Sequence, residues 1–114
     1  MNKVLQDLSL CKRAGKLALG FDAVRETAVN KTANLLVVSE GASKNTQKEL
    51  QFLADQHNIP LIQIGDTLND LWYALGKRVG VMSVTDKALG ELIALDASQA
   101  TAKWEEKLYD TKEI

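Results

Sequence analysis

The sequence has few of the residues on which disulfide-bonded and metal-binding folds depend. Cys11 is the only cysteine and His57 the only histidine among 114 residues. One cysteine excludes an intrachain disulfide, and together with one histidine it is too few for a tetrahedral zinc site made by this chain alone. We therefore expect neither a metal nor another cofactor, in a protein suited to the reducing cytoplasm.

Proline and long apolar runs are also scarce. No run approaches the roughly 18 apolar residues that a transmembrane helix needs. The first 20 residues place their cations after the apolar residues, unlike a secretory signal, so we expect neither export nor a membrane partner. One proline and 46% hydrophobic residues favour one globular domain. We assign it to residues 1–96, with a helical or frayed tail over 97–114.

The net charge of -1 hides an uneven distribution of charge. Residues 1–48 contain eight Lys or Arg and four acids, which gives +4, whereas residues 49–114 contain six and eleven, which gives -5. Such an asymmetry is compatible with an ordinary solvated surface. It equally permits a basic face that binds phosphates, because phosphate contacts respond to local charge.

Hydrophobic periodicity predicts helices that alternate with short apolar strands. Capping residues suggest that helices begin at Asp22, Thr46 and Thr67, and that Asp86 caps a last core helix. In the Thr67 helix we expect Trp72 on the apolar face. The first helix should span residues 2–13 and the second 22–31, and the strands should lie within residues 16–19, 35–38, 61–64 and 79–84. This alternation predicts an α/β fold, a three-layer α/β/α sandwich around a central mixed sheet of about four strands.

Catalytic motifs are not evident. Neither Gly15-Lys16 nor Gly76-Lys77 has the flanking residues of a P-loop, and no nucleophile elbow occurs. Cys11 lies on the predicted core face of its helix, and His57 is expected at a surface or capping position. Glu40 and Asp66 are placed to meet at the strand ends, but no recognisable motif supports this pair. We therefore expect a protein that is not an enzyme and has no small-molecule substrate.

Features typical of nucleic-acid binding are better represented. Gly20 would let a nucleic-acid backbone or base approach the main chain closely. Phe21 beside it either stacks on a base or is buried. Several cations lie in predicted loops and near helix starts, where free N–H groups attract phosphate. These cations are Arg13, Lys16, Lys44, Lys48, Lys77 and Arg78.

Four stretches together resemble a known family. They are Leu8-Ser-Leu-Cys-Lys-Arg-Ala-Gly-Lys-Leu-Ala-Leu-Gly20, Leu35-Leu-Val-Val-Ser-Glu-Gly-Ala-Ser-Lys-Asn-Thr-Gln-Lys48, Leu75-Gly-Lys-Arg78 and Val84-Thr-Asp86. In order and spacing they are similar to YlxQ-type bacterial proteins of the ribosomal protein seven-Ae and thirty-e family, over roughly residues 2–94. The resemblance implies binding to kink-turn RNA, an internal loop that bends the helix sharply, and makes RNA the expected partner and the ribosome a candidate one.

The resemblance also implies where RNA would bind. Carried over by position, the first contact region is the turn 20–26, which contributes Gly20, Phe21, Asp22 and Arg25, and the second is the loop 76–80. Kink-turn binders of the family have Asn-Glu-x-x-Lys where this sequence has Asp22, Ala23 and Glu26. We expect RNA binding with looser selectivity as a result.

Two other functions remain open at this point. The acidic second half, together with Ala23 and Glu26, is compatible with a protein-interaction adaptor that kept the fold and lost RNA specificity. An accessory domain that captures RNA for an enzyme is the third alternative, because related folds resemble such domains in some methyltransferases.

Overall fold

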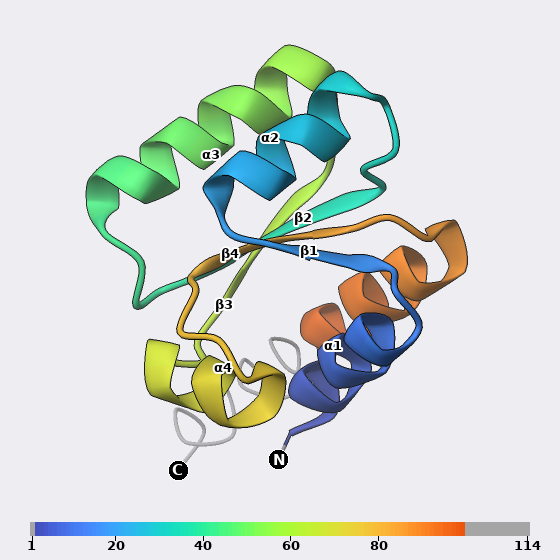
Figure 1. Cartoon of the computed structure of the whole chain (residues 1–114), viewed down its shortest axis with the longest axis vertical. Coiled ribbons are helices and arrows are strands. Elements are labelled where there is room, and N and C mark those ends of the chain that lie inside the picture. Colours follow the sequence, from blue (N-terminus) through green and yellow to red (C-terminus); the bar gives the residue numbers. More distant parts are fainter. Residues whose placement is uncertain (1, 100–114) are drawn as a thin grey trace, which may run out of the picture.

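One mixed sheet of four strands forms the middle layer of the molecule, and helices cover both of its faces (Figure 1). The computed structural model describes residues 2–99. The elements are α1 (Lys3–Arg13), β1 (Leu17–Leu19), α2 (Phe21–Val29), β2 (Leu35–Ser39), α3 (Lys44–His57), β3 (Leu61–Ile64), α4 (Leu68–Leu75) and β4 (Val81–Val84), followed by an unlabelled helix over residues 87–99. The predicted three-layer sandwich is confirmed.

The strand order is β1-β4-β2-β3. β4 is antiparallel to both of its neighbours, and β2 is parallel to β3. Strands β1, β2 and β3 therefore end at the same edge of the sheet at which β4 begins. Most of the predicted binding residues lie in the loops at this edge or in the first two turns of the helices that follow them. We call this edge the loop edge.

Alternate residues of the central strands supply two separate cores. Leu35, Val37 and Met82 point to the face covered by α1, α4 and the last helix. Leu36, Val38 and Val81 point to the face covered by α2 and α3. Strand β2 is buried along its whole length, as its wholly apolar sequence predicts.

Helix starts differ from prediction at two places. Gly20 is the N-cap of α2, so Asp22 lies in the first turn and the expectation that it caps the helix was wrong. Ser43 caps α3 by accepting a hydrogen bond from the Thr46 amide at 3.1 Å, so Thr46 is not the cap. The capping box of Thr67 and Asp70 is confirmed in both directions.

Two further predictions concern apolar faces and strand limits. Trp72 is 55% exposed, so its prediction on the inner face was wrong. α4 has only eight residues, of which Leu71 and Leu75 are buried, and Trp72 lies beside this stripe and not on it. β4 begins at Val81 rather than at residue 79. Beyond residue 99, the predicted tail lies outside the described residues.

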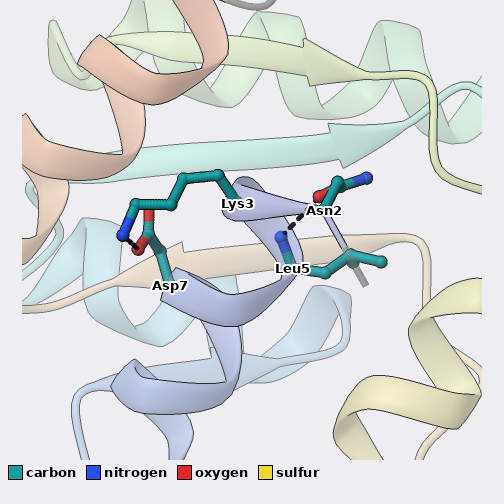
Figure 2. Close-up of polar contacts among 4 residues, drawn as sticks. All are labelled: Asn2, Lys3, Leu5 and Asp7. Carbon is teal, nitrogen blue, oxygen red and sulfur yellow. Dashed lines mark hydrogen bonds and ion pairs between the residues drawn. The ribbon is translucent and has the colours of Figure 1, made fainter.

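A buried carboxyl group lies near the start of α1. Asp7 is 2% exposed, and Lys3 Nζ lies 3.7 Å from its Oδ1 (Figure 2). The pKa of Asp7 is raised to about 6, chiefly by burial and secondly by a side-chain hydrogen bond with Asp96 and the negative charge of Asp96. Asp7 therefore keeps its proton to a higher pH than an exposed aspartate does.

Candidate nucleic-acid interface

Three separate stretches of the chain meet at the loop edge. The Gly20 amide donates to Val81 O at 3.1 Å, which joins the β1–α2 turn to the start of β4. The Ser39 amide donates to Gly80 O at 2.8 Å, which joins the same point to the end of β2. A Cβ built at Gly80 would lie 2.9 Å from Ala42 Cβ, so the loop before β4 packs tightly on the loop before α3.

The turn at Gly20 presents bare backbone to solvent. Its φ of 93° and ψ of 154° belong to a region that only glycine occupies readily. No atom lies within 4 Å of a Cβ built there, so the space in front of it is open within the described structure. No side chain caps the first turn of α2. The free N–H groups and the positive end of the helix dipole therefore make this turn attractive to an anion.

Three side chains of the α2 start form one cluster. The Arg25 guanidinium lies 4.9 Å from the centroid of the Phe21 ring, and its Nη1 lies 3.7 Å from Asp22 Oδ1. Phe21 is half-buried, whereas the side chains of Arg25 and Asp22 are 55% and 102% exposed. Arg25 thus offsets the carboxylate next to the open turn, while one face of Phe21 is already occupied by Arg25.

The start of α3 brings a second positive helix end to the loop edge. Lys44 is the first residue of α3 and is exposed, not part of the preceding loop as the sequence suggested. Lys48 follows one helical turn later on the same side, also exposed. A groove of about 470 Å³ between α2 and α3 is lined by Lys48 on one wall and by Phe21 and Arg25 on the other.

The loop between α4 and β4 adds two exposed cations, Lys77 and Arg78. Gly76, with φ of 75°, ends α4 in the left-handed conformation and turns the chain into this loop. Lys12 Nζ donates to Leu75 O, and a Cβ built at Gly76 would lie 3.5 Å from the same Nζ. The contact of Lys12 with α4 has no signal in the local sequence.

Arg13 and Lys16 lie at the other end of β1. The Thr85 amide donates to Lys16 O at 2.9 Å, whereas Gly20 pairs with Val81. The four residues of β4 therefore separate the two backbone positions by about 13 Å. Both cations are exposed, but the structure does not bring them together with the Gly20 turn.

The remaining candidates behave as structural residues. Cys11 is fully buried, and burial raises the pKa of its thiol to about 11, with smaller contributions from Asp7 and Asp86. Glu40 and Asp66 follow neighbouring strand ends, but the Asp66 carboxylate accepts instead from Asn2 Nδ2 at 2.6 Å. No group of three or more His, Cys, Asp or Glu residues within the described range is arranged to hold a metal ion.

None of the helices within residues 2–99 combines the length and the apolar character that crossing a membrane requires.

A family model places the chain among known proteins. The model of the Ribosomal protein L7Ae/L30e/S12e/Gadd45 family matches residues 2–95. The chain belongs to this family. The match confirms the predicted family assignment. No curated protein matches in a sequence comparison.

Two solved structures show the same L7Ae-type fold. A protein of unknown function from Bacillus halodurans C is 27% identical with a TM-score of 0.80, and the match covers 86% of this chain and 99% of that one. The Giardia lamblia 15.5kD RNA binding protein is 19% identical with a TM-score of 0.66, and the match covers 87% of this chain and 85% of that one. The second likeness bears on the fold alone.

Proposed function

We propose that this L7Ae-family chain is a non-enzymatic RNA-binding protein that holds a kink-turn-like RNA at the loop edge of its sheet. The observation that carries the proposal is the meeting of three segments there: the open Gly20 turn, the start of α3 at Lys44, and the Lys77-Arg78 loop. Bare amides, helix N-termini and exposed cations at one edge suit a phosphate backbone that bends sharply.

Family membership supports RNA as the partner. The matched family is described as one of ribosomal proteins, and a structural neighbour bears the name of an RNA binding protein. Ribosomal RNA and other structured RNAs are therefore the binding partners to test first. A bacterial, cytoplasmic setting and association with the ribosome stay predictions from the resemblance.

The turn favours backbone contacts over base reading. Asp22 stands where kink-turn binders of the family have an amide, and its carboxylate is paired with Arg25. Carboxylates repel phosphates, so Asp22 and Glu26 lower affinity in this turn unless Arg25 or neighbouring lysines offset them. We therefore expect the protein to tolerate changes in the G·A pairs of a kink-turn better than binders that have the Asn-Glu-x-x-Lys sequence.

A gel-shift titration tests the proposal. The probes are a kink-turn RNA and a straight duplex of equal length and composition, each titrated at low and at moderate salt. We expect tighter binding to the kink-turn at both salt concentrations, with both affinities falling as salt rises. Absence of binding to either RNA at low salt would refute RNA binding. Equal affinities would refute kink-turn recognition and leave only phosphate contacts.

A further inference from the structure

The groove between α2 and α3 contains an exposed aromatic side chain that the loop-edge site does not use. Phe52 is 70% exposed on α3 and lines this groove together with Phe21, Arg25 and Lys48. Its floor includes Leu53, which is 7% exposed. Phe52 takes part in neither of the aromatic and cation–π pairs found among the described residues, so its ring is not already stacked on another ring or cation there.

The spacing of residues along α3 forms a continuous stripe. Lys44, Lys48, Phe52 and Gln56 recur every fourth residue and are all exposed, so they lie in one row along the helix. At 1.5 Å per residue this row is about 18 Å long. It begins at the loop edge, because Lys44 is the first residue of α3, and it leads away from that edge.

Charge in the groove favours a polyanion. Arg25 on α2 and Lys48 on α3 stand on opposite walls of the groove, and Phe52 lines it from α3. Glu49 is the one carboxylate among the lining residues. Glu49 Oε1 accepts from Asn45 Nδ2 at 3.1 Å. Lys48 and Phe52 are one helical turn apart on α3, so a base next to a phosphate at Lys48 is within reach of the Phe52 ring. Gln56, one turn further, offers an amide that can donate and accept.

We infer that this groove binds a single-stranded RNA segment that continues from the structured RNA at the loop edge, with Phe52 stacking on one of its bases. This inference rests on the proposed function, because the RNA bound at the loop edge is what directs the single-stranded segment into the groove. Aromatic rings, cations and an amide in a row are the features by which proteins bind unpaired nucleotides. A purely apolar partner would cover Lys48, which forms no ion pair among the described residues.

The test compares three RNA probes: a blunt kink-turn RNA, the same RNA with a single-stranded uridine extension on either strand, and the extension alone. For the wild-type protein, one extension should tighten binding by at least about fivefold, which is the lower end expected of one stacked base. Phe52→Ala should remove this gain without changing affinity for the blunt RNA, and Phe52→Trp should restore it. Because Phe52 is largely exposed, truncation should leave the fold intact.

Tyr73→Ala is the matched control. Tyr73 is 88% exposed on α4, outside the groove, and its truncation should leave the gain unchanged. The inference is overturned if neither extension tightens binding or if Phe52→Ala retains the gain. If blunt RNA is not bound, the proposed function fails, and the groove is then tested with the single-stranded extension alone. A loss of affinity for the extension in Phe52→Ala supports the inference, and an unchanged affinity overturns it.

A protein occupant is the competing outcome. A photocrosslinking residue placed at position 52 in cells would then yield adducts with protein and none with RNA. That result would overturn the inference in favour of a protein-docking surface.

Discussion

Replacing Asp7 by Asn should stabilise the protein near neutral pH. The pKa of Asp7 rises from 3.8 to about 6, chiefly through burial and secondly through Asp96. Between these two pH values the folded protein retains a proton that the unfolded chain has lost, so the free energy of unfolding falls as pH rises through this window. At about 1.4 kcal/mol per pH unit, the full cost above pH 6 is about 3 kcal/mol. Asn avoids that cost, because it is uncharged.

Urea unfolding of both proteins from pH 4 to pH 8 measures this effect. The difference in unfolding free energy, Asp7→Asn minus wild type, should be smallest at pH 4, rise to a plateau above about pH 6 and reach up to about 3 kcal/mol. Asp55→Asn, which removes an exposed carboxylate instead of a buried one, is measured in parallel as the control. A difference that does not vary with pH, or an Asp7→Asn protein less stable than wild type at pH 7.5, would refute the reasoning.

Three further outcomes follow from the backbone, the caps and the thiol. Gly20→Ala should destabilise the fold by about 1–3 kcal/mol from backbone strain alone. Gly15→Ala should destabilise it less, because the φ of Gly15 is 71°, in the milder left-handed region. Thermal unfolding compares the two variants. Thr67→Ala should cost about 0.5–2 kcal/mol in urea unfolding, because it removes the cap of α4. Cys11 should resist a thiol-specific reagent at pH 8 and react quickly once denaturant unfolds the chain; fast native labelling would contradict its burial.

Much of the fold follows from local chemistry. The apolar run 35–38 is a strand buried on both faces, and the Thr67–Asp70 spacing gives the predicted capping box. The wrong predictions have two physical causes. A periodic pattern marks every apolar position, yet a short helix such as α4 buries only the stripe that meets its neighbours, so Trp72 stays outside. At Gly20 the cap is the backbone itself, which side-chain preferences do not reveal.

The candidate site was predictable only in part. Sequence reasoning grouped Arg13 and Lys16 with Gly20 because the three residues are close along the chain. In the structure, Arg13 and Lys16 precede β1 and Gly20 follows it, so β1 separates the two cations from the Gly20 turn. The contact between Lys12 and Leu75 depends on the packing of α1 on α4, which no local pattern encodes. The family resemblance, not periodicity, indicated that the Gly20 turn and the 76–80 loop belong together.

The most direct test compares two variants that each remove two positive charges. One combines Lys77→Ala with Arg78→Ala at the loop edge, and the other combines Arg13→Ala with Lys16→Ala before β1. Binding to a kink-turn RNA is measured across a range of salt concentrations. We predict that the loop-edge variant loses at least about tenfold in affinity and has a shallower salt dependence, whereas the other stays within about threefold of wild type. Equal losses, or a larger loss from the Arg13 and Lys16 pair, would contradict an RNA site at the loop edge.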